Sequence, residues 1–138
     1  MFSFVLYPTF LEARKQFLLS QIASLAVKET LDLYIGDVSI KWPNDIYWKD
    51  KKICGMLIEN DLMGIHISQS IAGVGININQ KEFHSSAPNP ISIIQITHRE
   101  SDRMEILAQV LQRIKEYYKI LQEGDIEFIT DRYQAALF

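Results

Sequence analysis

Alternation of apolar and polar residues, the period of a β-strand, recurs along the first half of the chain. Within residues 2–7 every second side chain is Phe or Leu, and this predicts a strand that Pro8 ends. Residues 38–42 alternate in the same way and predict a second strand. Residues 46–58 indicate a hairpin around a polar turn, and residues 65–79 indicate a long strand after the next turn. Together these segments predict an antiparallel meander.

Helical spacing of apolar residues appears in three segments. Residues 10–31 predict an amphipathic helix whose apolar stripe packs on a sheet. A second helix is expected to begin after Ser101 or Asp102 and to end at Gly124, because glycine often terminates helices. A third is expected to begin at Asp125 and to run to the last residue. The polar, proline-containing stretch 80–92 is expected to be a loop.

These elements predict an α+β fold, a mainly antiparallel mixed sheet flanked by helices. A candidate capping motif supports the predicted start of the second helix. If Asp102 is the N-cap, Glu105 stands three residues later, at the position of a capping box.

Composition narrows the class of protein. The 138 residues suit one domain, and 48% apolar with 22% charged residues suits a single packed core. A net charge of −3 without a basic run disfavours nucleic-acid binding. The apolar runs are too short for a membrane span, and no basic segment precedes the first of them, so a cytoplasmic location is expected. The single cysteine, Cys54, excludes a disulfide framework and is expected to be buried.

The segment Lys41-Trp42-Pro43-Asn44-Asp45 carries the strongest chemical signal. It reads as a strand end that turns at a proline and presents an amide and a carboxylate, after which the hairpin returns Lys52 beside them. A lysine next to a carboxylate suits a phosphate–metal site, since the ammonium neutralises phosphate charge and the carboxylate can hold Mg²⁺. The alternative is an ordinary turn with a solvated lysine at its hairpin.

A second signal is Gly73-Val74-Gly75-Ile76-Asn77. Two glycines within a strand let another group approach the backbone, and that group is either a ligand or a crossing strand. The segment is not a dinucleotide-binding fingerprint, because no helix follows it. The three histidines lack metal-ligand spacing and are expected to be structural or exposed.

Taken together, these segments resemble the biotin protein ligase, or biotin–[acetyl-CoA-carboxylase] ligase, family. The resemblance rests on four stretches in order: 41–45, Lys52-x-x-Gly55, Leu57-x-Glu59 and 73–77. It implies the class II aminoacyl-tRNA synthetase/biotin synthetase-like fold. It also implies a two-step reaction, in which biotin and ATP form biotinyl-5′-AMP and a lysine of a biotin carboxyl carrier protein domain then displaces AMP.

The resemblance assigns roles to eight residues. Lys52 corresponds to the lysine that contacts the adenylate phosphate and the biotin carboxylate, and Asp45 to the acidic residue near Mg²⁺. The others are expected to hold the turn, line the biotin pocket or touch the nucleotide: Asn44, Gly55, Leu57, Gly73, Ile76 and Asn77.

The chain also departs from the family pattern. The Gly/Arg-rich loop that folds over the adenylate and the small C-terminal β domain are absent, so residues 1–138 are expected to be a truncated, partial catalytic domain. Two alternatives stay open: a lipoate or octanoate ligase or transferase, and a catalytically incomplete fragment that forms a homodimer or binds the carrier. No nucleic-acid or membrane partner is expected.

The missing loop leads to a testable expectation. The 138-residue chain with biotin, ATP and Mg²⁺ should form biotinyl-adenylate far more slowly than an ordinary enzyme, whose kcat is about 10 s⁻¹. Pyrophosphate release measures this rate. Turnover in the ordinary range would contradict the expectation.

Overall fold

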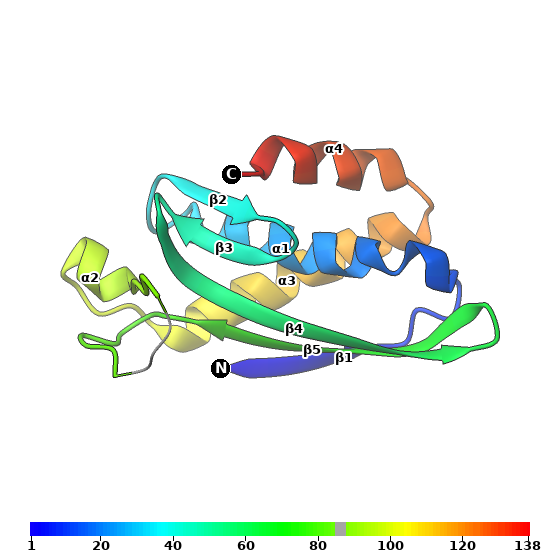
Figure 1. Cartoon of the computed structure of the whole chain (residues 1–138), viewed down its shortest axis with the longest axis horizontal. Helices are drawn as coiled ribbons and strands as arrows, with labels where there is room; N and C mark the ends of the chain where they lie inside the picture. The colour runs from blue at the N-terminus through cyan, green and yellow to red at the C-terminus, as the bar shows by residue number, and fades with distance from the viewer. Residues whose placement is uncertain (85–87) are drawn as a thin grey trace.

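The computed structural model describes residues 1–84 and 88–138, which form a five-stranded sheet with helices packed on one face (Figure 1). The strands are β1 (Phe2–Leu6), β2 (Val38–Lys41), β3 (Asp45–Trp48), β4 (Lys51–Met63) and β5 (His66–Ile76). The helices are the 3₁₀ turn η1 (Ala13–Lys15), α1 (Phe17–Leu31), α2 (Ile93–Thr97), α3 (Arg103–Gln122) and α4 (Ile126–Ala136).

The strand order is β1-β5-β4-β3-β2, and each neighbouring pair is antiparallel. The predicted meander is therefore confirmed from β2 to β5, and the α+β fold is confirmed with it. Side chains on one face of the sheet are buried against α1 and α3, among them Ile40, Ile46 and Val74. We call the other face, which the helices leave uncovered, the open face.

A bulge in β4 decides which residues reach the open face. Ile46 is opposite Cys54, yet Tyr47 is opposite Lys52, so Ile53 is an extra residue on β4. Ile53 and Cys54 are both buried on the helix side. A bulge reverses the alternation of side chains that follows it. Lys52 and Gly55, three residues apart, consequently share the open face.

The first helix begins later than its apolar spacing predicts. Residues 10–31 were expected to be helical, but α1 starts at Phe17. The backbone before it pairs instead with the β4–β5 hairpin: Ile67 donates to the carbonyl of Leu11, and Ala13 donates to the carbonyl of Ile65. These hydrogen bonds cover a part of β5 that β1 is too short to reach, which is why tertiary pairing prevails over helical spacing here.

Strand and turn boundaries also differ from the expectation. β4 continues through residues 60 and 61, which were predicted as a turn, and the chain reverses at Gly64 with φ of +63°. Part of the predicted loop 80–92 leads directly into α2, whose capping box is formed by Ser92 and Gln95. This short helix was not predicted.

The structure confirms two predicted helix starts, at Asp102 and Asp125, and corrects two details of the C-terminal helices. Asp102 is the N-cap of α3, with its carboxylate accepting from the next turn. Glu105 does not complete a capping box; its carboxylate accepts from the hydroxyl of Tyr34 at 3.0 Å. α4 stops at Ala136 instead of running to the last residue, because the amide of Phe138 donates to the carbonyl of Ile40 at 2.7 Å.

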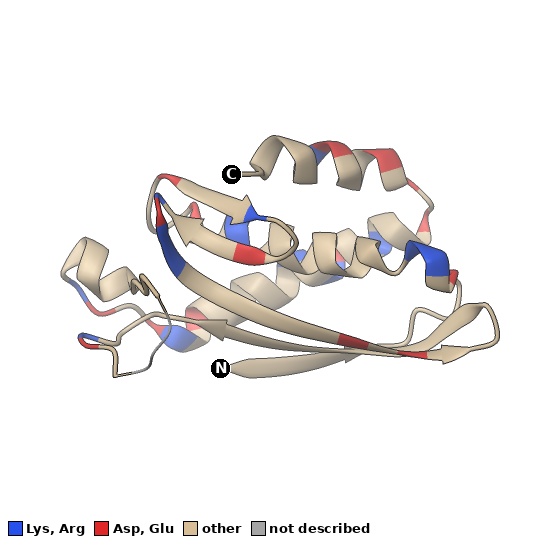
Figure 2. Ribbon diagram, in the orientation of Figure 1, with Lys and Arg blue, Asp and Glu red and all other residues tan. Residues whose placement is uncertain are grey.

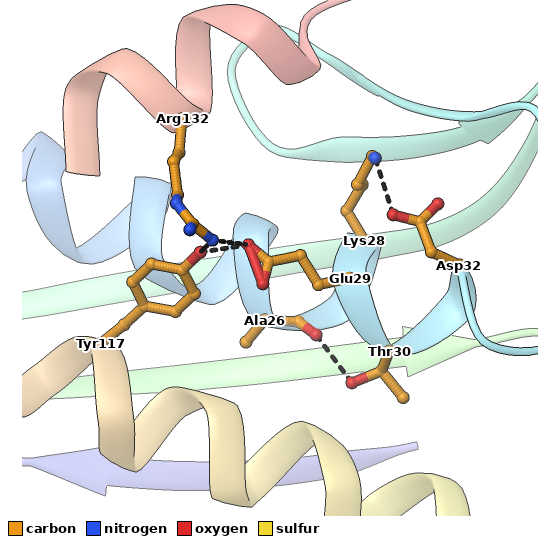
Figure 3. Close-up of polar contacts among 7 residues, drawn as sticks. All are labelled: Ala26, Lys28, Glu29, Thr30, Asp32, Tyr117 and Arg132. Atoms are coloured by element: carbon orange, nitrogen blue, oxygen red, sulfur yellow. Dashed lines mark hydrogen bonds and ion pairs between the residues drawn. The ribbon is translucent and has the colours of Figure 1, made fainter. Parts of the chain in front are cut away.

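Three helices are joined by one polar cluster (Figure 3). The hydroxyl of Tyr117 on α3 donates to the carboxylate of Glu29 on α1. The guanidinium of Arg132 on α4 lies 3.4 Å from that hydroxyl and 3.6 Å from the Glu29 carboxylate. Burial and the neighbouring Glu29 raise the pKa of Tyr117 to about 12. The cluster therefore fixes α4 against the other two helices.

This cluster predicts a measurable loss of stability. Tyr117→Phe should lower the free energy of unfolding at pH 7 by about 1 kcal/mol, the usual net value of one hydrogen bond. An unfolded tyrosine ionises near a pKa of about 10. The folded pKa of Tyr117 is higher, so its contribution is complete below pH 10 and is lost as pH rises towards 12. Urea denaturation at pH 7 and at pH 10–11 measures both effects.

Tyr118→Phe is the matched control, because it removes a hydroxyl from the next position of α3 that makes no hydrogen bond within the described residues. Equal losses in the two variants would contradict a specific role for the Tyr117 cluster.

Candidate functional site

The open face carries an ion pair where β3 begins and β4 returns. The ammonium Nζ of Lys52 lies 3.3 Å from Oδ1 of Asp45. The two side chains keep 38% and 33% of their surface exposed, so water screens the pair and it contributes little to stability. Both charged groups consequently remain accessible to a ligand.

Asp45 is delivered by a short loop. Lys41 at the end of β2 is paired with Asp45 at the start of β3, which leaves only residues 42–44 between them. Asn44 does not point into the site: its Nδ2 donates to Oγ of Ser20 on α1 at 3.0 Å. Its role is therefore to tie the loop to the helix layer.

The backbone of Lys52 is hydrogen-bonded to residues 89 and 91 as well as paired within the sheet. Its amide donates to the carbonyl of Asn89 at 2.8 Å, and its carbonyl accepts from the amide of Ile91 at 3.0 Å. Pro88 and Pro90 thereby border a cavity of about 190 Å³ at the end of the open face. The cavity is lined by Lys52, Cys54, Gly55, Gly75, Asn77, Phe83, Pro88 and Pro90.

Beside the ion pair, glycines leave parts of the strands without side chains. A Cβ on Gly55 would lie 3.1 Å from Cε and 3.2 Å from Nζ of Lys52, closer than side chains normally pack. Gly75 is directly opposite Gly55, and Gly73 is directly opposite Leu57, which is 66% exposed. We call Gly55, Gly73, Gly75 and Leu57 the glycine strip.

An uncharged stretch of this surface separates the Lys52–Asp45 pair from Glu59, the next charged residue along β4. Neither β1 nor β5 contains Asp, Glu, Lys or Arg, and β4 contains none between Lys52 and Glu59 (Figure 2). A ligand lying along the glycine strip would therefore meet uncharged surface and reach the Lys52–Asp45 pair with one end. This arrangement suits a molecule with an uncharged body and an anionic head.

The predicted site residues divide into three groups. Lys52, Gly55 and Asn77 line the cavity, with Asp45 ion-paired to Lys52. Leu57 and Gly73 lie farther along the open face.

Asn44 and Ile76 are not brought to the cavity. Ile76 is paired with Cys54, is 8% exposed, and belongs to the core on the helix side of the sheet.

Four cavity residues were not among the predicted site residues although the sequence carried a signal for them. Gly75 stands in the Gly-x-Gly segment, and Pro88 and Pro90 punctuate the loop. Phe83 is the one aromatic residue in the polar stretch 80–92, and that isolation was the signal for it.

Other chemistries are disfavoured by the side chains near this face. Burial raises the pKa of the Cys54 thiol far above its ordinary value, which suppresses the nucleophilic thiolate. Within residues 1–84 and 88–138 no three His, Cys, Asp or Glu side chains gather as metal ligands. Asp45 could hold a divalent cation only if phosphate and water oxygens supplied its remaining ligands, which is how Mg²⁺ is usually bound. No helix among the described residues has the length and apolarity to cross a bilayer.

Comparison with curated proteins and families gives a consistent result. Residues 1–77 match the sequence profile of the Biotin/lipoate A/B protein ligase family. The chain is 28% identical over 115 residues to the bifunctional ligase/repressor BirA of Escherichia coli K12, covering 81% of this chain and 36% of that protein. It is 30% identical over 96 residues to the biotin–[acetyl-CoA-carboxylase] ligase of Paracoccus denitrificans, covering 64% of this chain and 40% of the relative.

Solved structures extend the likeness over nearly the whole chain. Biotin protein ligase from Aquifex aeolicus in complex with biotin and ATP superposes with a TM-score of 0.85 and 31% identity, covering 99% of this chain and 56% of that one. The Leishmania major enzyme in complex with biotinyl-5-AMP, at 20% identity and a TM-score of 0.75, supports the fold alone. The chain thus spans between about a third and three fifths of these relatives. On the extent of the family match, it belongs to the biotin/lipoate A/B protein ligase family.

Proposed function

We propose that this chain forms the adenylate-binding part of a biotin protein ligase, which converts biotin and ATP to biotinyl-5′-AMP and transfers biotin to a lysine of a carrier protein. The observation that carries the proposal is the Lys52–Asp45 pair, 3.3 Å apart, at the charged end of the glycine strip. A carboxylic acid with an uncharged ring system and a nucleotide phosphate are the two ligand parts that this surface suits.

In the first step the biotin carboxylate attacks the α-phosphorus of ATP. A bond forms between a carboxylate oxygen and the α-phosphorus, and the bond between the α-phosphorus and the leaving pyrophosphate breaks. Both reactants are anions, so they repel each other unless a cation lies between them. Lys52 is proposed to supply that cation: its ammonium would donate to the carboxylate and to a phosphoryl oxygen together, which would position the reactants and stabilise the transition state.

In the second step the amine of the acceptor lysine attacks the acyl carbon, and AMP departs with the bonding electrons. The ammonium of Lys52 would stabilise the phosphate of the departing AMP. No nucleophile from the protein is needed in either step, and this agrees with the buried, suppressed thiol of Cys54.

Asp45 is proposed to hold Mg²⁺ together with phosphate oxygens and water. Its single carboxylate fits that arrangement, in which the substrate provides most of the ligands. The cation would supply further neutralisation of the departing pyrophosphate. Asp45 also orients Lys52, because its carboxylate lies 3.3 Å from the ammonium.

The glycine strip is proposed to accept the biotin ring. Gly55, Gly73 and Gly75 leave the strands without side chains of their own, with Met1 next to Gly75, and Leu57 provides an apolar edge. Asn77 and Phe83, at the cavity wall, are proposed to contact the nucleotide, with the aromatic ring offering a stacking surface.

The proposed partners are a biotin carboxyl carrier protein domain and a second copy of the chain. A carrier lysine would enter at the exposed side of the Lys52–Asp45 pair. β1 is an edge strand of the described sheet, and a free edge can pair with another strand. The proposed location is the cytoplasm.

A lipoate or octanoate ligase is the alternative within the same family. Lipoate also combines an uncharged body with a carboxylate, so charge alone does not separate the two substrates. We favour biotin because of the resemblance of residues 41–45 and the likeness to biotin ligases. Calorimetric titration of the 138-residue chain with non-hydrolysable biotinyl- and lipoyl-adenylate analogues decides between them, and tighter binding of the lipoyl compound would overturn the choice of biotin.

The role of Lys52 predicts a specific loss of affinity. Lys52→Gln should weaken binding of the biotinyl-adenylate analogue by about 10- to 100-fold, since the charge-assisted hydrogen bonds to the phosphate disappear. Lys51→Gln is the control, because Lys51 is the exposed neighbour on the same strand and carries the same charge. Equal effects of the two substitutions would contradict a specific contact and leave only general electrostatic attraction.

The close approach at Gly55 predicts a second effect. Gly55→Ala should preserve the fold, since the atoms that its Cβ meets are the flexible end of Lys52, but it should displace the ammonium. We expect about a tenfold weaker affinity for the same analogue with a nearly unchanged melting temperature. Gly36→Ala provides the comparison, because a Cβ there meets nothing within 4 Å. Wild-type affinity in Gly55→Ala would show that the position of Lys52 does not matter.

A further inference from the structure

The loop that delivers Asp45 is anchored by α4, an element outside the residues that match the family profile. The hydroxyl of Tyr133 on α4 donates to the carbonyl of Pro43 at 2.6 Å. Tyr133 is 1% exposed and Pro43 is exposed, so the hydrogen bond is partly buried at the edge of the core. A residue that lies 90 positions after Pro43 thereby contacts the loop between β2 and β3.

Each of the three loop residues has its own anchor. The ring of Trp42 packs at 6.2 Å from that of Phe17, whose ring meets Tyr133 edge-on at 5.7 Å. Pro43 is held by the Tyr133 hydroxyl, and Asn44 by Ser20. The loop is consequently attached to α1 on one side and to α4 on the other.

α4 is itself fixed at two further points. Arg132, the neighbour of Tyr133, joins Tyr117 and Glu29 (Figure 3). Beyond the helix, the amide of Phe138 donates to the carbonyl of Ile40, next to the residue that pairs with Asp45. In Figure 1, the C-terminal end of α4 lies beside the end of β2. The helix therefore acts as a rigid support behind the β2–β3 turn.

This support matters because the Asp45 carboxylate has few contacts of its own, and the backbone of Asp45 follows directly on the loop. Its carboxylate has an ion-pair contact with the flexible end of Lys52, and a third of its side chain is exposed. The backbone of the loop must therefore place it, and displacement of a reacting or charge-stabilising group by about 1 Å is enough to lower activity greatly.

We propose that Tyr133 is a positioning residue of this site: through the Pro43 carbonyl it keeps the carboxylate of Asp45 where a nucleotide-bound cation can reach it. The proposal rests on the proposed function. It assigns to α4 a part in nucleotide binding and leaves the glycine strip, where biotin is proposed to lie, unaffected.

The test is Tyr133→Phe in the 138-residue chain. The substitution keeps the ring against Phe17 and removes the one hydroxyl. Amide ¹⁵N relaxation should show the order parameters of Asn44 and Asp45 falling from about 0.85, typical of rigid backbone, towards about 0.6. The Kd for ATP with Mg²⁺ should rise about fivefold, whereas the Kd for biotin should stay within about twofold of wild type.

Two further variants make the result specific. Tyr34→Phe removes a hydroxyl that donates to Glu105 on α3 and not to the loop, and it should change neither the loop nor either affinity. Ser20→Ala removes the acceptor of Asn44 and should reproduce the effects of Tyr133→Phe, including the split between the two ligands, from the opposite side of the loop.

The outcomes separate the two proposals. Unchanged order parameters in Tyr133→Phe, or an equal loss of affinity for both ligands, would overturn the positioning role and leave Tyr133 as a packing residue. If wild type binds neither ligand, the proposed function fails. The relaxation data then decide alone: mobility confined to residues 42–45 supports the positioning role, and its absence overturns it.

Discussion

The proposed function depends on one close pair of charges, the Lys52 ammonium and the Asp45 carboxylate, on a sheet face that no described helix covers. Opposite charges this exposed do little for stability. Their importance comes from their surroundings, which are glycine backbone on one side and Pro88 and Pro90 on the other. The turns and strand pairings around them bring these two groups, from two different strands, to one place.

Two irregularities achieve this. A three-residue loop returns β3 tightly against β2, so Asp45 is the first residue of its strand. A bulge at Ile53 then shifts the alternation of β4, so that Lys52 and Gly55 face the same side. Without the extra residue, one of the two would point into the core, where an uncompensated ammonium is costly. Regular strands would therefore have separated the lysine from the glycine that makes room for it.

Much of the architecture could be predicted from the sequence, because strand periods and helix caps are local signals. The strands β1 to β5, the N-cap Asp102 and the proximity of Lys52 to Asp45 follow from alternation and turn residues. The bulge could not be predicted, since Ile53 and Cys54 are both apolar and fit either register. The same limit explains Ile76: its neighbours in the Gly-x-Gly segment face the site, but its own side chain points to the helices.

Contacts between distant segments form the second limit. Nothing local to Tyr133 indicates that its hydroxyl meets Pro43, and nothing local to residues 10–16 indicates pairing with the β4–β5 hairpin. Such contacts depend on the assembled layers. They show that α4, beyond the family match, contacts the loop that precedes Asp45.

A crystal structure of this chain with a non-hydrolysable biotinyl-adenylate analogue would test the central claim most directly. The account predicts the phosphoryl group within about 3 Å of Nζ of Lys52, the usual length of a charge-assisted hydrogen bond, with the bicyclic ring lying on Gly55, Gly73 and Gly75. An analogue bound on the helix side of the sheet, or with its phosphate remote from Lys52, would contradict it.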